Sequence, residues 1–155
     1  MRTTAYLFIL AVLAAGCGTK TVQIDADATA AQATRWNGTL SAPSGMEGVV
    51  QIQGRTWMGA DGNQTTARID INNATRGGEH PWHVHEGRCG SGGRIVGDAG
   101  TYGVLKIDSD GRASREVRLN MPLPTYGDYH VNVHAATSNM QTIVACANLA
   151  APTTR

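Results

Sequence analysis

The chain has 155 residues, a formal net charge of +1, 19 glycines and few aromatic side chains. This length suits one domain with a hydrophobic core. The near-neutral charge provides no basic surface, so we expect no nucleic acid as a partner. Many glycines in a chain of this size favour short strands joined by tight turns.

The first 16 residues are typical of an export signal. Residues 5–13 form an apolar run that is too short to span a bilayer, and small residues follow it up to Cys17. Residues 13–17 resemble a bacterial lipobox, although Ala14 stands where lipoboxes usually have leucine. We therefore expect residues 1–16 to be a lipoprotein-type signal peptide and Cys17 to carry the lipid. An ordinary cleaved secretory peptide is the alternative.

A tether, one domain and a tail are expected after this signal. Residues 17–35 are small and polar without a sustained period, which is typical of a flexible tether. Residues 36–150 hold recurrent strand-like segments and are expected to form a β domain, followed by a disordered tail over residues 151–155. A lipid on Cys17 would anchor the domain to a membrane of the bacterial cell envelope, on its periplasmic or outer surface.

About eight strand-like segments follow one another in the predicted domain. Besides a strand rich in histidine, they cover residues 39–40, 49–53, 66–71, 102–107, 113–119, 129–135 and 142–146. Asp61–Asn63 and Asp108–Gly111 carry Asp-Gly signals and are expected to turn two hairpins. No long stretch keeps a helical period. The pattern predicts an all-β sandwich or a flattened barrel.

The histidine-rich strand lies in residues 79–89, which hold three of the five histidines of the chain. His83 and His85 are separated by one residue, so a β-strand puts both rings on one face with Cα atoms roughly 6–7 Å apart. Two imidazoles on one face indicate a metal site. A single His-x-His pattern is a weak signal, and the residues downstream have to support it.

Cys89 and Cys146 are expected to form a disulfide. Three cysteines in an exported protein leave one over, and a lipid on Cys17 would leave these two as a pair in an oxidising compartment. Closing so long a loop stabilises a fold by about 4 kcal/mol in the chain-entropy description. Two free buried thiols are the alternative.

Four segments of the chain resemble the Cu/Zn superoxide dismutases, in the order in which that family has them. They are Gly78–Cys89, similar to the copper-ligand strand and first half-cystine; Arg94–Gly100, similar to Arg-His-Val-Gly-Asp-Leu-Gly; Val131–Ala135, similar to the strand with the late copper ligand; and Ala145–Cys146, similar to the second half-cystine. In the first segment, Pro-Trp replaces the family's Gly-Phe.

The resemblance implies an eight-stranded Greek-key β-barrel or sandwich of that family. It also implies that His83, His85 and His134 bind one copper ion and form the catalytic centre, while His80 supports the site as a packed, hydrogen-bonded neighbour. Three neutral imidazoles suit copper in either oxidation state. Dismutation needs copper because the metal is reduced and reoxidised by one electron in turn, and zinc cannot change valence.

Several features of that family are missing from this chain. No histidine lies between His85 and His130, so the residue that bridges copper and zinc is absent. Ile95 replaces a zinc ligand, and Ile143 stands at the position of the anion-guiding arginine. Asp98 alone does not make a zinc site and is expected to hydrogen-bond local backbone in a turn. We therefore expect copper without zinc.

Two further expectations concern residues near these motifs. His130 shares a strand face with His134 but lies roughly 13 Å from it along the strand, so we expect it at the surface or rim. Arg88 or Arg94 would have to replace the missing guide arginine, which is left as an open hypothesis.

Three functions follow from these patterns. The first is a copper-only superoxide dismutase that meets superoxide arriving from outside the cell. The second is a non-catalytic protein that stores, buffers or delivers copper ions in the envelope. The third is a purely structural domain, because residues 129–134 also resemble a strand of the chordin-type β domains. The His-x-His strand and the cysteine pair weigh against the third.

Overall fold

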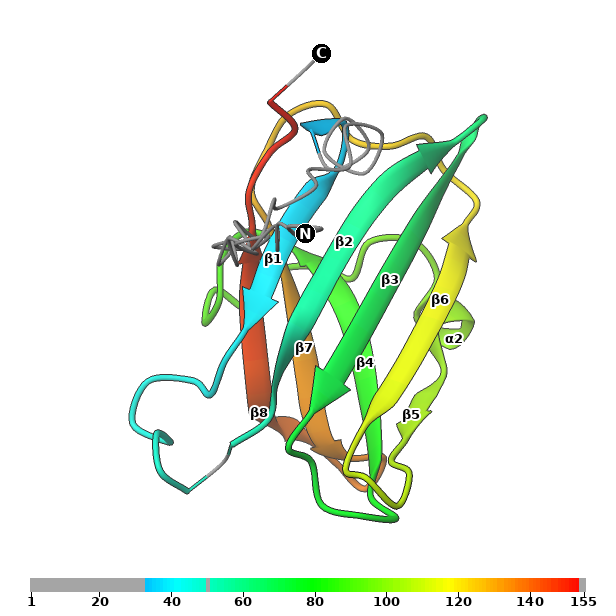
Figure 1. Ribbon diagram of the computed structural model, residues 1–155. Coiled ribbons are helices and arrows are strands. Elements are labelled where there is room, and N and C mark those ends of the chain that lie inside the picture. Colours follow the sequence, from blue (N-terminus) through cyan, green and yellow to red (C-terminus); the bar gives the residue numbers. More distant parts are fainter. Residues whose placement is uncertain (1–32, 50, 154–155) are drawn as a thin grey trace, which may run out of the picture.

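The structure, a computed structural model, describes residues 33–49 and 51–153, and this part of the chain is almost entirely β (Figure 1). The predicted signal peptide, Cys17 and most of the predicted tether lie outside the described residues. The elements in chain order are β1 (Trp36–Leu40), β2 (Gln53–Asp61), β3 (Gln64–Asn72), β4 (Glu79–Glu86), α2 (Ala99–Tyr102), β5 (Val104–Lys106), β6 (Ala113–Leu119), β7 (Tyr129–Ala136) and β8 (Asn139–Leu149). The prediction of an all-β domain is confirmed.

The strands form two antiparallel sheets of four strands each, in the orders β1-β2-β3-β6 and β5-β4-β7-β8. Figure 1 shows the first sheet in front of the second. Along one side the sheets meet through two isolated bridges in or next to strands β1 and β8, Asn37 with Ala150 and Ser41 with Cys146. No continuous ladder joins the sheets in the described part of the chain, so the domain is a sandwich and not a closed barrel.

The alternation of side chains in β4 and β7 places the core on one face and four of the five histidines on the other. Trp82 and Val84 of β4, and Val131 and Val133 of β7, are fully buried members of one hydrophobic cluster shared with the other sheet. Because successive side chains of a strand point to opposite faces, the residues between them face away from the core. His83 and His85 of β4, like His130 and His134 of β7, are therefore on the outer face of this sheet, whereas His80 shares the alternation of Trp82.

The two predicted hairpins have different outcomes. Gly62 and Asn63 connect β2 to β3, which pair along their whole length, so the first hairpin is confirmed. The second is wrong, because β5 pairs with β4 while β6 pairs with β3 in the other sheet. The Asp108 side chain does close a tight turn there by accepting from the backbone N–H groups of Asp110 and Arg112. The turn therefore connects the two sheets. The apolar residues of the flanking strands do not specify which sheet each strand joins.

Two predicted strands are shorter than the sequence pattern indicates. The strand expected over residues 49–53 is wrong, because Val49 is 81% exposed in a turn and β2 begins only at Gln53. Within residues 102–107 only β5 is strand, since Tyr102 closes α2 and Gly103 follows with φ of 66°. A positive φ of this kind suits glycine and ends the helix.

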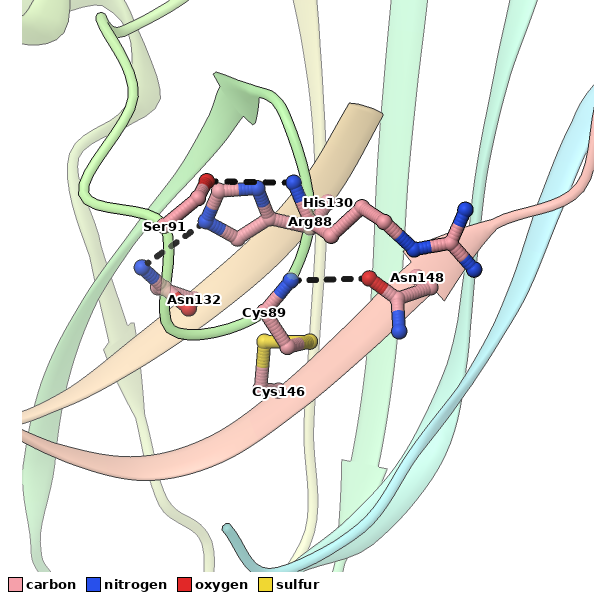
Figure 2. The surroundings of a disulfide bond; sticks show 7 residues. All are labelled: Arg88, Cys89, Ser91, His130, Asn132, Cys146 and Asn148. Atoms are coloured by element: carbon pink, nitrogen blue, oxygen red, sulfur yellow. Dashed lines mark hydrogen bonds between the residues drawn. A yellow bond between two sulfur atoms is a disulfide. The ribbon is translucent and has the colours of Figure 1, made fainter. Parts of the chain in front are cut away.

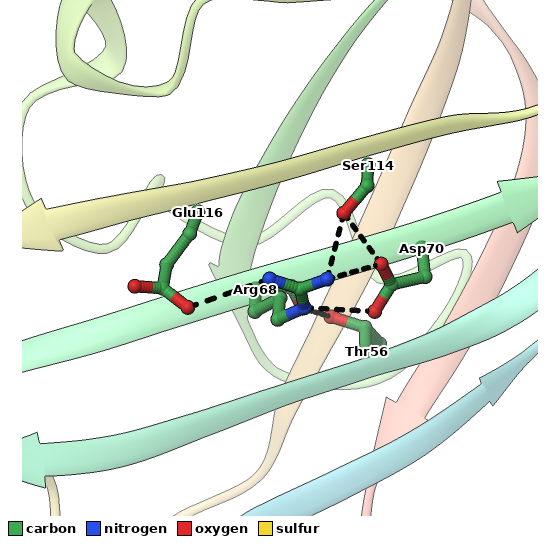
Figure 3. Close-up of polar contacts among 5 residues, drawn as sticks. All are labelled: Thr56, Arg68, Asp70, Ser114 and Glu116. Atoms are coloured by element: carbon green, nitrogen blue, oxygen red, sulfur yellow. Dashed lines mark hydrogen bonds and ion pairs between the residues drawn. The ribbon is translucent and has the colours of Figure 1, made fainter.

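The outer face of the sheet β1-β2-β3-β6 carries a charge network that contains no histidine or cysteine (Figure 3). Arg68 of β3 donates two hydrogen bonds to Asp70, 2.8 and 2.9 Å long, and one to Ser114 of β6. Glu116 lies 3.7 Å from the same guanidinium. These side chains are more than a third exposed, and such pairs contribute about 0–1 kcal/mol each. We regard the network as support for the β3–β6 pairing.

The described ends of the predicted tether and tail lie side by side. The backbone N–H of Thr153 donates to the carbonyl of Ala33 over 2.9 Å. The guanidinium of Arg35 lies 3.9 Å above the ring of Trp57 on β2, a favourable cation–π distance.

None of the helical segments within residues 33–49 and 51–153 has the length and apolar character needed to cross a bilayer.

Candidate metal site

His83 and His85 of β4 and His134 of β7 form a group that can hold a metal ion. One ligand nitrogen from each residue lies within 4.8 Å of the other two. The ring centroids are 5.3 Å apart for His83 and His134 and 5.9 Å apart for His83 and His85. These are the three ligands predicted from the sequence, and the antiparallel pairing of β4 with β7 brings them together.

Backbone carbonyl groups determine which nitrogen of two of these rings is free. The Nδ1 atom of His134 lies 2.7 Å from the carbonyl oxygen of Met140, and the Nδ1 atom of His85 lies 2.8 Å from that of Gly93. A carbonyl oxygen only accepts, so each Nδ1 carries the hydrogen and donates it, and Nε2 is the nitrogen of each ring that can offer a lone pair. The Nε2 atom of His85 is buried without a hydrogen-bond partner. This is the arrangement that a metal-binding histidine requires.

His83 contributes its Nδ1 atom to the group, whereas His85 and His134 contribute Nε2. Its Nδ1 atom lies 3.2 Å from the Nε2 atom of His134. Burial lowers the pKa of His83 to about 4, together with the nearby charges of His134 and His85, although the backbone of Ala99 acts in the opposite direction. The ring is therefore neutral at pH 7, and its lone pair is available to a metal if the proton is on Nε2.

His134 is also held in its neutral form. Burial is the largest cause and lowers its pKa, the Met140 backbone raises it in part, and the charge of His85 lowers it further. His83 is 7% exposed and His134 is 5% exposed, whereas His85 is only partly buried. His85 is thus the most exposed residue of the group, although its Nε2 atom is buried. A cation between these nitrogens would satisfy the buried lone pair of His85, so the donor set fits a metal ion.

His80 touches the site without belonging to the three-histidine group. Its Nδ1 atom lies 3.0 Å from the backbone carbonyl oxygen of His134. This hydrogen bond links the start of β4 to the residue of β7 that carries the third imidazole. It is the kind of contact that a supporting residue makes, and the supporting role itself stays a prediction.

The disulfide between Cys89 and Cys146 is present, with Cα atoms 6.0 Å apart, so the predicted pairing is confirmed (Figure 2). It ties the loop after β4 to strand β8. The backbone N–H of Cys89 also donates to the side chain of Asn148 over 2.8 Å. The same loop continues to Gly93, whose carbonyl accepts from His85. The cysteine pair therefore anchors the loop whose later residue, Gly93, contacts His85.

His130 is not at the surface or rim, so that expectation is wrong. Its exposed fraction is 0%. It pairs with His85 directly across the β4–β7 ladder, and the two rings stack with centroids 5.2 Å apart and planes 19° apart. Burial lowers the pKa of His130 and is the largest effect. The backbone of Gly87 raises this pKa in part, and the charge of His85 lowers it further. The sequence gives the distance between His130 and His134 along β7 but not the residue that faces His130 on β4. For this reason its burial against His85 could not be predicted.

The arginines considered as anion guides are both paired with carboxylates. Arg88 lies 3.3 Å from Asp128, and Arg94 lies 2.9 Å from Glu86, in each case at the surface. Asp98 accepts a hydrogen bond from the backbone N–H of Gly100 at the start of α2. Its predicted role as a local turn residue is confirmed, and it is outside the three-histidine group.

Tyr102 is a neighbour of the site that the sequence analysis missed. It is fully buried, and its hydroxyl donates to the carbonyl of Val96 over 2.6 Å. Its ring meets His83 and Trp82 edge to face, with centroids 5.3 and 5.1 Å away. Burial raises the pKa of Tyr102, so the phenol remains protonated at neutral pH. A tyrosine at the end of a short helix carries no sequence signal for such a contact.

No family model matches this chain, and no curated protein matches it either.

Proposed function

We propose that this chain is a divergent, zinc-free relative of the Cu/Zn superoxide dismutases that binds one copper ion and converts superoxide to oxygen and hydrogen peroxide at the cell envelope. The observation that carries the proposal is the three-imidazole group of His83, His85 and His134, with its buried and unpartnered nitrogen. Sequence resemblance in four ordered segments adds the family.

The architecture supports this assignment. Strand β6 lies beside β3, and β7 lies beside β4, so both sheets contain connections that skip intervening strands. Crossovers of this kind are what a Greek-key sandwich requires. The disulfide joins the loop after the histidine strand to the last strand, as the resemblance implies. Each of these features occurs in other all-β proteins, and their combination with the histidines favours the proposed family.

Copper is favoured over zinc by chemistry and by the resemblance. Three imidazoles are a donor set that both metals accept. Divalent copper binds such a set more tightly than zinc in the usual order of affinities. When bound here, copper would supply reversible one-electron chemistry, which zinc lacks. The group contains no carboxylate among the described residues, which gives a second metal no obvious ligand.

The protein's own part in this chemistry is to hold neutral donors in place and to limit access. Burial of His83 and His134 keeps both rings unprotonated at neutral pH. Hydrogen bonds to the carbonyls of Gly93 and Met140 fix the orientation of two rings. Solvent, and therefore protons and a small anion, would enter beside His85, the most exposed of the three. With no bridging histidine in the sequence, protons for peroxide would come from water.

A non-catalytic copper-holding protein is the second candidate, and a specific observation favours it. Arg88 and Arg94 are each neutralised by a carboxylate. Positive charges that are paired in this way attract an anion more weakly than unpaired ones. Such a protein would hold copper equally well and consume superoxide slowly or not at all.

Superoxide decay in a stopped-flow instrument separates the two candidates. The copper-loaded mature protein is mixed with superoxide in the presence of a chelator that silences free copper. A decay that rises in proportion to the loaded protein supports the enzyme. The His134→Ala variant and the metal-free protein should give the background decay, and a Thr39→Ala variant on the exposed part of β1 should match the parent. Stoichiometric copper with background decay in the parent would select the copper-holding protein instead.

A further inference from the structure

We infer that His130 is a positioning residue for the metal site, whose stacked ring holds His85 so that its Nε2 atom points toward His83 and His134. This inference rests on the proposed metal binding. It concerns a residue that lies outside the three-histidine group itself.

The contact between His130 and His85 differs from the other contacts inside the site. These two rings lie nearly parallel, with planes 19° apart. His83 meets His85 and His134 edge to face, at interplanar angles of 86° and 62°. A parallel ring covers the face of its neighbour and restricts rotation of that ring, whereas an edge contact leaves more freedom. His130 therefore defines the plane of His85.

His85 is the ligand that most needs such support. It is only partly buried, while the other two members of the group are almost inaccessible. Its hydrogen bond to the carbonyl of Gly93 fixes one ring atom, and the ring could still swing about that point. Gly93 belongs to the loop between β4 and α2, so this anchor is not part of a continuous strand. A ligand has to be held within about 0.5 Å and 10–20° for a defined metal geometry, and the stacked ring supplies the missing restraint.

His130 is itself firmly held in place. It is fully buried, in direct register with His85 on the neighbouring strand. The side-chain amide of Asn132 lies 3.4 Å from its Nε2 atom, and Asn132 pairs across the ladder with Cys146 of the disulfide. Figure 2 shows His130 and Asn132 next to this disulfide and its loop. The restraint on His85 thus comes from a fully buried residue on the strand that pairs with the disulfide-linked strand.

Stability alone does not explain a histidine at this position. A buried polar ring with one long hydrogen bond costs free energy relative to an apolar side chain of similar size. Leucine would leave no buried ring nitrogen without a partner at this position. A planar ring that can stack on His85 is what histidine offers and leucine lacks.

Two substitutions that fill the space but differ in shape test this inference. His130→Phe keeps a planar ring, and His130→Leu replaces it with a branched side chain that cannot stack. The affinity of each protein for Cu(II) is measured by competition with a chelator, and the electron paramagnetic resonance spectrum of the copper-loaded protein reports the ligand geometry. Thermal unfolding of the metal-free proteins checks that both variants fold. Met58→Ala, in the buried part of β2 in the other sheet, serves as a control for lost stability.

We expect His130→Leu to bind Cu(II) about 10–100-fold more weakly, as is typical when a residue that orients a metal ligand is lost, and to change the spectrum. We expect His130→Phe to stay within about threefold of the parent, and Met58→Ala to melt earlier without losing copper affinity. Equal affinity of His130→Leu and the parent would overturn the inference, as would equal weakening in both folded His130 variants. Failure of the parent to bind copper would instead remove the proposed function and this inference with it.

Discussion

For His85 and His134, the nitrogen that the imidazole presents is determined by backbone carbonyls that have no sequence signature. Gly93 is the clearest case, because its carbonyl accepts from His85 while its Cα lies against the main chain. A Cβ atom built at this residue would come far inside contact distance of the carbonyl of Glu86. The glycine is therefore required by close backbone approach, and its role in the site follows from its place in the loop.

Gly93→Ala should displace the loop and weaken metal binding. The added methyl group would push against backbone, which cannot rotate away as a side chain can, so we expect a loss of about 1–3 kcal/mol in the free energy of unfolding. Copper affinity should fall as the hydrogen bond to His85 is lost. Gly100→Ala in α2 is the matched control, because its Cβ would meet only the Asp98 side chain at an ordinary 3.5 Å. Chemical denaturation and chelator competition measure both effects, and equal values for the two variants would refute the argument.

The metal-free protein should lose stability as the pH falls from about 6.5 to 4. The pKa of His83 is lowered to about 4 in the folded state, mainly by burial, whereas an unfolded histidine titrates near 6.5. Above this window neither state binds the proton. Between pH 6.5 and 4 the unfolded histidine binds a proton, whereas the folded one stays mostly unprotonated. The free energy of unfolding therefore decreases as the pH falls, by on the order of 3 kcal/mol at pH 4. The lowered pKa values of His130 and His134 act in the same direction.

Urea denaturation of the metal-free protein across this pH range measures the effect. A His83→Gln variant should show a shallower decrease, since glutamine does not titrate. A free energy of unfolding that stays constant between pH 6.5 and 4 in the parent would show that His83 is more accessible to protons than its burial indicates.

At the scale of elements, the loop between β4 and α2 connects the fold to the site. Its first part is tied to β8 by the disulfide, and its later part supplies the Gly93 carbonyl and pairs Ile95 with His85 through an isolated bridge. The position of one ligand therefore depends on a covalent link that is distant from it in the sequence.

Replacing both cysteines, Cys89→Ser with Cys146→Ser, should lower the free energy of unfolding by about 4 kcal/mol, because the bridge closes a loop with a sequence separation of 57. Copper affinity should also fall, since the loop that holds His85 becomes freer. Denaturation of the oxidised parent, the reduced parent and the double variant measures the first effect. Reduced parent and double variant should agree with each other. A double variant as stable as the oxidised parent would contradict this account of the loop.

The elements show how far sequence reasoning reaches. Residues 113–119 and the hairpin at Gly62 were predicted correctly because alternation and turn chemistry are local signals. The turn that begins at Asp108 was mistaken for a hairpin because its local chemistry is that of a tight turn. Which strands pair on either side of it is decided by packing, and here they belong to different sheets.

The same limit applies to the site. The three histidines could be selected from spacing and resemblance, and the cysteine pair from parity. His130 could not be placed, because its neighbour depends on the register between β4 and β7, which the chain does not encode locally. Tyr102 was missed because its contact with His83 depends on how α2 packs against β4. The three histidines could therefore be predicted from the sequence, whereas the residues that surround them are determined by tertiary contacts.

At the scale of the whole molecule, the charge distribution bears on how fast an anion would reach the site. The chain is nearly neutral, and the two arginines nearest in sequence to the histidine strand are paired with Asp128 and Glu86. Long-range attraction of an anion depends on unpaired positive charge and weakens with salt.

We therefore expect Arg88→Ala and Arg94→Ala to leave any superoxide decay and its salt dependence nearly unchanged, by less than about twofold. The variants Asp128→Asn and Glu86→Gln should each leave the partner arginine without its carboxylate. The rate of superoxide decay at low salt should then increase. Decay rates at several ionic strengths make this comparison. A steep loss of rate in either arginine variant would identify that arginine as the missing guide and correct our description.

The central claim is that His83, His85 and His134 together hold copper, one ion per chain, without zinc. The most direct test is the metal content of the mature protein after equilibrium dialysis against equal copper and zinc, for the parent and for the three single His→Ala variants. We predict one copper and negligible zinc in the parent, and loss of most of the copper in each variant. Zinc in place of copper, or full copper retention in His134→Ala, would contradict the account.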